Sequence, residues 1–184
     1  MEIKFSQELL TILNYARDEA MRTGSYGIGA DHVVLGVLRH GDNNACRALS
    51  ACGIDAGSLK NAIDTRIFSD QAVPWQDLPR VRPTRAAAAL LNGSAYEALK
   101  HGQHEIRSSH FLLALLRSEG NVSVDILQHL GLSYDRLYEL MREHRFVLQR
   151  QEQETVLPGI EDLLGPLGEQ LTRLYGEAPT QLLN

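Results

Sequence analysis

The sequence is poor in the features that mark secreted and membrane-bound proteins. It has only 2 cysteines in 184 residues, Cys46 and Cys52, and they lie six residues apart in one predicted helix. Their Cβ atoms would point away from each other there and could not form a disulfide, which favours a reducing compartment. No apolar run approaches the roughly 18 residues of a membrane helix, and the start lacks the layout of a signal peptide. We therefore expect a cytoplasmic protein that does not bind membranes.

Positive charge and catalytic motifs are also scarce. With 18 basic and 23 acidic residues the net charge is −5, so no basic face is expected to bind nucleic acid. No Gly-x-x-x-x-Gly-Lys-Ser/Thr motif occurs, and this chain by itself therefore cannot hold the phosphates of ATP. A small hydrolase using a histidine is disfavoured, because no serine or cysteine lies in a nucleophile motif. The sequence predicts no enzymatic activity, no cofactor and no metal site.

What the sequence does contain is an internal duplication. Residues 29–39, Gly-Ala-Asp-His-Val-Val-Leu-Gly-Val-Leu-Arg, have a counterpart 78 residues further on, Arg-Ser-Ser-His-Phe-Leu-Leu-Ala-Leu-Leu-Arg at 107–117. The same register aligns residues 5–64 with 83–142 without a gap and yields 14 identities in 60 positions. Chance would yield about a quarter of that number, given ordinary residue usage. Two copies of one structural unit are therefore predicted.

Each copy reads as a unit of four helices. In the first copy the predicted N-caps are Ser6, Asn43 and Asp55, and glycines follow the first three helices. In the second copy helices are predicted after Thr84, Ser108, Asn121 and Ser133. A unit of about 60 residues rarely folds securely alone, so the two copies should pack about a pseudo-two-fold axis. The predicted fold class is all-α, with two four-helix repeats, a C-terminal helical tail and no β-sheet.

The predicted domain covers residues 1–149. It consists of one repeat at 5–64, a linker at 65–83 and a second repeat at 84–142, whose last helix is expected to continue past its counterpart. Three prolines favour irregular structure in the linker, and its lone Trp75 is expected to hold it against the surface. Residues 150–184 read as an acidic linker or tail with a short helix.

The duplicated segment resembles the amino-terminal domain of the Clp (Hsp100) ATPases, a double Clp repeat that precedes the ATPase modules of ClpA, ClpB and ClpC. The family's recurring sequence is approximately Gly-Thr-Glu-His-Leu-Leu-Leu-Gly-Leu-Leu-Arg, and here it stands at residues 29–39. Further residues that stand where the family has them are Phe5-Ser6, Glu19-Ala20, Gly24, Leu49 and Gly53. The resemblance covers residues 5–142 and looks most like the ClpC type. Residues 164–174 are similar to the helix that leads into the family's first ATPase module.

The resemblance implies a ligand-binding cleft in each repeat. In ClpC relatives this cleft is implied to receive phosphoarginine on substrates: a helix start takes the phosphate, and the acid before the histidine pairs with the guanidinium. The matching residues are Ser6 with Asp31 in the first repeat, and Thr84 with Ser109 in a degenerate second site. Asp31 is shorter than the family's glutamate, and Ser109 carries no charge. The alternative for Asp31 is an acid favoured at a helix start by the helix dipole.

His32 and His110 occupy equivalent positions in the first turns of their helices. A pair of ligands or bases is one interpretation. We expect structural roles instead, in which each imidazole binds a backbone carbonyl or a helix end, because no cysteine or carboxylate is spaced to complete a site.

Two further features remain open to a functional interpretation. Residues 101–105, His-Gly-Gln-His-Glu, contain zinc-ligand types, but Gly102 interrupts the continuous helix of such motifs and a solvated loop is expected. The aromatic candidates for a partner surface are Tyr15, Tyr26, Tyr96 and Trp75.

The resemblance as a whole implies a non-catalytic recognition domain of a Clp-type protein unfoldase or protease system. Such a domain binds protein substrates or adaptor proteins and passes them to an ATPase ring. The alternative is a free-standing accessory protein that docks on the Clp machinery in trans. Both alternatives predict protein partners, including Clp ATPase or protease components.

Overall fold

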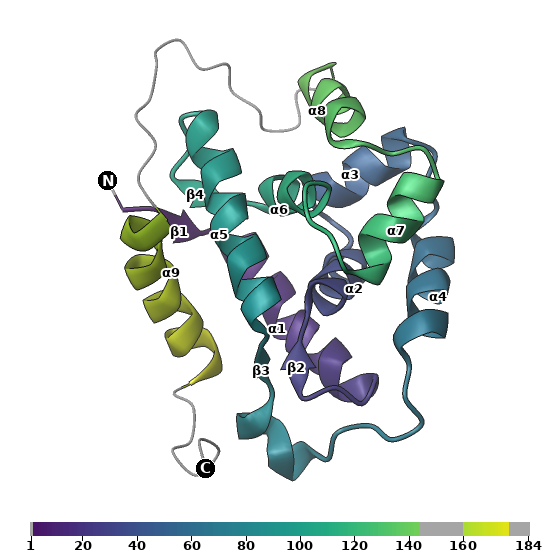
Figure 1. Cartoon of the computed structure of the whole chain (residues 1–184), viewed down its shortest axis with the longest axis vertical. Coiled ribbons are helices and arrows are strands. Elements are labelled where there is room, and N and C mark those ends of the chain that lie inside the picture. The colour runs from purple at the N-terminus through teal and green to yellow at the C-terminus, as the bar shows by residue number, and fades with distance from the viewer. Residues whose placement is uncertain (1, 144–159, 177–184) are drawn as a thin grey trace.

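A computed structural model describes residues 2–143 and 160–176 of the chain (Figure 1). The first repeat contains α1 (Gln7–Arg22), α2 (Ala30–His40), α3 (Asn44–Ala51) and α4 (Ala56–Ile67). The second contains α5 (Arg85–Lys100), α6 (Ser108–Leu115), α7 (Val122–His129) and α8 (Tyr134–Glu143). A 3₁₀-helix, η1 (Trp75–Arg80), lies between the repeats, and α9 (Ile160–Tyr175) follows them. The predicted all-α class is confirmed.

Most of these helices begin where the sequence supplies a side-chain cap. The cap oxygens of Ser6, Asn43, Asp55, Thr84 and Asn121 each accept a hydrogen bond from the backbone N–H three residues on. Helix α6 is an exception, because its N-cap is Arg107 and the Ser108 hydroxyl does not cap it. That hydroxyl instead accepts a hydrogen bond from Ala45 N of the first repeat, at 3.3 Å.

Four two-residue strands make the pseudo-two-fold relation explicit. They are β1 (Lys4–Phe5), β2 (Gly27–Ile28), β3 (Arg82–Pro83) and β4 (Glu105–Ile106). Parallel pairing sets Phe5 opposite Ile106 in β1–β4, and Ile28 opposite Pro83 in β2–β3. A shift of 78 residues turns each pair into the other. The expectation of no strand pairing was wrong at this local level, because a two-residue strand has no periodicity to detect.

The two repeats share one core. Helix α1 packs along α2, and α5 along α6, while the short helices cross between repeats: α3 contacts α6, and α7 contacts α2 and α4 (Figure 1). Phe111, Leu9 and Ile12 are among the largest side chains with almost no exposure, and they come from both repeats. Neither repeat therefore buries its apolar face without the other.

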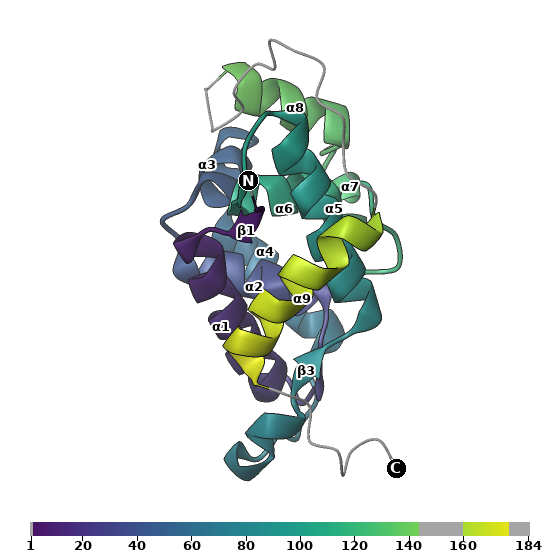
Figure 2. The ribbon, with the colours of Figure 1, turned by 90° about the vertical axis from the view of Figure 1, so that its left-hand side faces the viewer.

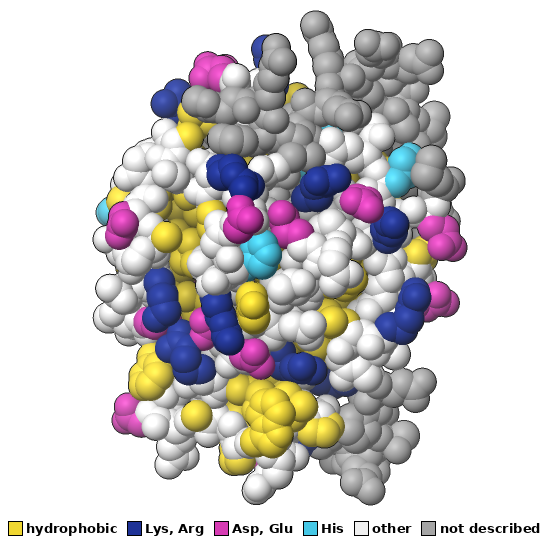
Figure 3. Space-filling view, turned by 180° about the vertical axis from the view of Figure 1, so that it is seen from behind, with side chains coloured by type: hydrophobic (Ala, Val, Ile, Leu, Met, Phe, Trp, Pro, Cys, Tyr) yellow, Lys and Arg dark blue, Asp and Glu magenta, His cyan; other side chains and the backbone are white. Residues whose placement is uncertain are grey.

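The linker between α4 and β3 is held by its backbone and not by its tryptophan. Val73 N donates to Met21 O at 2.9 Å, and Ser69 N donates to Thr23 O at 3.0 Å. Trp75 is 72% exposed, so its predicted role in fastening the linker was wrong. Figure 3 shows hydrophobic side chains gathered at the end of the molecule that carries this linker.

Helix α9 lies across the first and second repeats (Figure 2). Its Gln170 accepts from Phe5 N at 2.7 Å and donates to Ile3 O at 3.1 Å, which occupies the free edge of β1. Its Tyr175 hydroxyl donates to Leu13 O at 2.7 Å. The predicted continuation of the last helix of repeat two falls at residues outside the described ranges. In the described part of the chain no helix is long and apolar enough to cross a membrane.

Candidate functional site

The predicted ligand-binding residues lie at two equivalent junctions between the repeats. Ser6 N-caps α1, and its N–H donates to Ile106 O at 3.0 Å, close to the start of α6. Thr84 N-caps α5, and its N–H donates to Ile28 O at 3.0 Å, close to the start of α2. Each junction therefore joins the start of one repeat's first helix to the start of the other repeat's second helix.

This arrangement contradicts the expected pairing of Ser6 with Asp31. Helix α1 has 16 residues, and a helix of that length spans about 24 Å. Asp31 lies near the far end of α1, because the next residue, His32, has its Nε2 atom 3.1 Å from the Thr23 hydroxyl at the C-cap. Ser6 and Asp31 therefore lie at opposite ends of the α1–α2 pair.

The expected pairing of Thr84 with Ser109 is wrong for the same reason. Strand pairing brings Thr84 to the junction that contains Asp31, and Ser6 to the junction that contains Ser109. The four residues lie at two junctions, and each junction is built from both repeats. Sequence reasoning missed this exchange because no residue pattern identifies the partner of a two-residue strand.

The Asp31 carboxylate is bound to the N-terminus of α7. Its Oδ1 accepts from the Ser123 N–H at 2.8 Å and from the Ser123 hydroxyl at 2.7 Å, and its Oδ2 accepts from the Val122 N–H at 3.2 Å. A carboxylate at this position satisfies N–H groups that have no partner within the helix and is favoured by the helix dipole. Asp31 therefore joins the two repeats, and it remains partly exposed.

Ser109, the counterpart of Asp31, has no such role. Its side chain is fully buried, and its hydroxyl has no hydrogen-bond partner among the described residues. The carboxylate of this second junction comes from Glu8, whose Oε1 accepts from Ser108 N at 3.1 Å. Glu8 has Ala86 as its counterpart in the second repeat. The two junctions therefore share a backbone plan but place their single carboxylates on different helices.

The histidines bind the first turns of their own helices. His32 Nδ1 accepts from Gly29 N, and His110 Nδ1 accepts from Arg107 N, each at 2.9 Å. His32 Nε2 also contacts the Thr23 hydroxyl, whereas His110 Nε2 is buried without a partner in the described chain. Burial lowers the pKa of His32, and burial, with the nearby His101 and Arg107, lowers the pKa of His110 to about 3. Both rings are held neutral as helix-capping groups.

The residues considered for metal binding or nucleophilic chemistry are occupied in other ways. His101 is buried, and its Nδ1 lies 2.7 Å from Glu97 O. Within the described ranges no three histidine, cysteine or acidic side chains come together as metal ligands. Burial raises the pKa of both the Cys46 and the Cys52 thiol, which disfavours a reactive thiolate.

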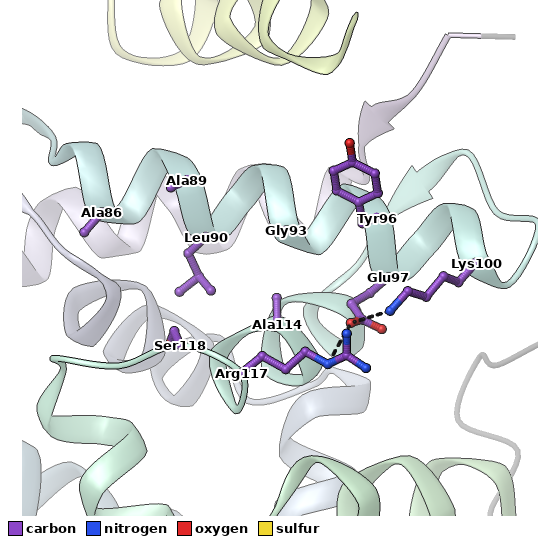
Figure 4. Close-up of a pocket in the computed structure, with 10 residues that line it drawn as sticks. All are labelled: Ala86, Ala89, Leu90, Gly93, Tyr96, Glu97, Lys100, Ala114, Arg117 and Ser118. Carbon is purple, nitrogen blue, oxygen red and sulfur yellow. Dashed lines mark hydrogen bonds and ion pairs between the residues drawn. The ribbon is translucent and has the colours of Figure 1, made fainter. Parts of the chain in front are cut away.

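A groove of about 580 Å³ lies between α5 and α6 (Figure 4). Ala86, Ala89, Leu90 and Gly93 of α5 line one side, and Ala114 of α6 faces them. At one end Glu97 lies 3.3 Å from Lys100 Nζ and 3.8 Å from Arg117 Nε. No sequence motif marks this groove. The replacement of Tyr15 by Gly93 between the copies was the signal that could have revealed it.

The fold defines a duplicated helical domain. The sequence model of the family described as "Clp repeat (R) N-terminal domain" matches residues 4–130 and 82–160. The chain belongs to this family, as the resemblance implied. Domains of this family are non-catalytic regulatory domains of Clp/Hsp100 ATPases, which generally bind substrates and adaptors.

Individual relatives agree with this assignment. The chain is 29% identical over 133 residues to the negative regulator of genetic competence ClpC/MecB of Bacillus subtilis, and 28% identical over 133 residues to the chaperone protein ClpB of Oceanobacillus iheyensis. Each alignment covers 72% of this chain and 16% of the relative. The Hsp104 N-terminal domain of Candida albicans has a similar fold, with a TM-score of 0.62, 18% identity, and coverage of 80% of this chain and 94% of that one.

Proposed function

We propose that this chain is the recognition domain of a Clp-type unfoldase or protease system. It binds unfolded segments of protein substrates, or adaptor proteins that carry them, in the cytoplasm, and it performs no chemistry itself. The observation that supports the proposal is the double Clp repeat, which the chain shares with the N-terminal regions of ClpC and ClpB over 72% of its length. An open groove lined by small and apolar side chains suits the capture of unfolded segments.

The test is binding to a permanently unfolded protein. Fluorescence anisotropy of a labelled, reduced and alkylated protein should rise saturably as the purified chain is added, whereas the same protein in its native, disulfide-bonded form should give no rise. Absence of saturable binding to the unfolded form, or ATP-independent turnover of a substrate by the chain alone, would contradict the proposal.

If the protein is a free-standing accessory protein, it should act in trans. Added in trans to a Clp ATPase and protease whose own N-terminal domains have been removed, the chain should restore degradation of the unfolded protein. If it restores degradation only when fused to the ATPase, the alternative of a free-standing accessory protein is wrong.

A second candidate is phosphoarginine recognition at the junction of Thr84 and Asp31. The strand pairing supports this combination, because it places the N-terminus of α5 beside the helix that carries a partly exposed carboxylate. A helix N-terminus favours the phosphate, and a carboxylate favours the guanidinium. The junction of Ser6 suits this ligand less, since Glu8 would repel the phosphate and Ser109 is buried and uncharged.

Calorimetric titration with free phosphoarginine tests this candidate. Asp31→Asn keeps a side-chain oxygen for α7 but removes the charge, and it should weaken binding by about tenfold or more because a charged hydrogen bond is lost. Ser109→Ala is the matched control and should bind as wild type. Titration of wild type without saturable heat would remove phosphoarginine as a ligand and leave the recognition of unfolded protein untouched.

A further inference from the structure

The groove between α5 and α6 lies where the two repeats differ in side-chain size. Gly93 and Ala114 face each other across it, and a Cβ atom built on Gly93 would lie 3.7 Å from Ala114 Cβ (Figure 4). The position equivalent to Gly93 in repeat one is Tyr15. The Arg39 guanidinium lies over the Tyr15 ring, 4.5 Å from its centroid, and the His40 ring is 6.5 Å from it. A tyrosine of the chain itself therefore fills this place in the first repeat.

The helices also approach each other more closely in the first repeat. Gly36 takes the place of Ala114, and a Cβ atom on Gly36 would lie only 2.6 Å from Ile12 O. No side chain can occupy that position without moving α1 from α2. In the second repeat Ala114 fits, and the space beside Gly93 stays open.

The arginine shared by the two repeats lies over a tyrosine from a different helix in each repeat. In repeat two the Arg117 guanidinium lies 3.9 Å from the centroid of the Tyr134 ring on α8, not over α5. The counterpart of Tyr134 in repeat one is Ala56, which lines a cavity of about 460 Å³. Each repeat thus supplies one tyrosine to its arginine, from opposite sides. The side that lacks the tyrosine is open, and in repeat two that side is the apolar groove.

The charges at the end of the groove favour a ligand that carries a carboxylate. Glu97 is 2% exposed and accepts from the Tyr134 hydroxyl at 2.7 Å. This one carboxylate faces two cations, Lys100 and Arg117, so the end of the groove has a surplus positive charge. A carboxylate on the ligand would complement that charge.

We propose that the groove between α5 and α6 binds an aromatic side chain of a protein segment, with an acidic residue of the same segment at Lys100 and Arg117. The ring occupies the space beside Gly93 that Tyr15 occupies in the first repeat. This inference rests on the proposed recognition of protein segments and specifies which segments are recognised. A ring buried against alanine, leucine and glycine contributes most of the binding energy, and the carboxylate sets the preference among aromatic segments.

The direct test uses labelled peptides of one length that differ at two positions. The first carries tyrosine next to aspartate, the second alanine next to aspartate, and the third tyrosine next to lysine. The first should bind about tenfold or more tightly than the second, because the second peptide lacks the aromatic anchor. It should also bind more tightly than the third. Equal affinity for the tyrosine and alanine peptides would overturn the proposal.

Filling the groove from within is the complementary test. Gly93→Tyr supplies the side chain that repeat one has and should abolish the preference for the tyrosine peptide. Gly93→Ala adds only one methyl group, whose carbon would lie 3.7 Å from Ala114 Cβ, and should weaken the preference for the tyrosine peptide less than Gly93→Tyr does. If Gly93→Tyr does not fold, as judged by circular dichroism, Ala114→Leu replaces it, because Ala114 lines the groove and the longer side chain occupies the space beside Gly93. Unchanged peptide binding in the filled variant would contradict the proposal.

Three further outcomes distinguish binding at the groove from the alternatives. If Gly93→Tyr still binds the unfolded protein with wild-type affinity, the recognition function stands and the groove is not its site. If wild type binds no unfolded protein, the function itself is wrong. A concentration-dependent dimer that disappears in both Gly93→Tyr and Trp75→Ala would assign the groove to the exposed tryptophan of a second copy and would overturn the proposal.

Discussion

The two repeats share one helical plan but use it differently. The first repeat is closed between its long helices, because Gly36 allows close approach and Tyr15 covers the remaining space. The second repeat is open there. Its larger Ala114 replaces Gly36 between the helices, and its Gly93 replaces Tyr15, so no side chain covers the remaining space. The same helical plan therefore gives closer packing in one repeat and a groove in the other. The following predictions test this contrast, in order of decreasing expected effect.

The largest effect is expected from leucine at the equivalent positions 36 and 114. Gly36→Leu forces side-chain atoms into the backbone of α1 and should destabilise the protein by about 3 kcal/mol or more. Ala114→Leu extends into the open groove and should cost less than about 1.5 kcal/mol. Urea denaturation of both variants measures the difference. Equal destabilisation would show that the two helix pairs are packed alike.

The second prediction concerns the pH dependence contributed by His110. The folded pKa of about 3 lies below the unfolded value of 6.5, so the unfolded state binds more protons between them. This contribution to stability is present above pH 6.5 and is lost as the pH falls toward 3. Between pH 7 and pH 5 wild type should lose about 2 kcal/mol from this group.

His110→Asn removes the titrating group while keeping an acceptor for Arg107 N. The variant should therefore show a smaller loss of stability between pH 7 and pH 5, measured by chemical denaturation at both values. His32→Asn should change the slope in the same direction, since burial also lowers its pKa. A slope identical to wild type in His110→Asn would mean that this ring titrates normally in the folded protein.

A smaller effect is expected at the junction between the repeats. Asp31→Ala removes all three hydrogen bonds to the start of α7 and should cost about 1–2 kcal/mol, the usual cost of losing a cap with a favourable helix dipole. Thermal denaturation at pH 7 that leaves the melting temperature unchanged would contradict this structural role.

The smallest effect is expected at the counterpart of that residue. Ser109→Ala removes a buried hydroxyl that has no partner in the described structure, and it should be neutral or stabilising by up to about 1 kcal/mol. Destabilisation beyond that range, measured beside Asp31→Ala, would reveal a hydrogen bond that the second junction needs.

Much of this architecture could be predicted from local patterns. The ungapped duplication identified the repeats, and short polar side chains at Ser6, Asp55 and Thr84 marked helix starts, because a cap acts within three residues of itself. The role of Ser108 could not be predicted, since its hydroxyl binds Ala45 of the other repeat. The exposure of Trp75 and the docking of Gln170 on β1 likewise depend on segments far away in the chain.

The candidate sites show the same division. The family resemblance implied ligand-binding roles for Ser6, Asp31, Thr84 and Ser109 in clefts within single repeats, whereas the strand pairing joins Ser6 to the Ser109 helix and Thr84 to the Asp31 helix. It also missed the groove, although the difference between Tyr15 and Gly93 was visible in the alignment. A missing side chain becomes an opening only when the neighbouring helix does not move in to fill it, and that depends on packing.

The all-α class, the duplication and the family could be predicted from the chain alone, because hydrophobic period, capping and repeated residues are encoded locally. Which helix starts meet, which carboxylate binds which helix, and which repeat stays open depend on how the folded helices pack. These features arise from contacts between residues far apart in the chain, where a single methyl group at position 114 or its absence at position 36 sets the distance between two helices.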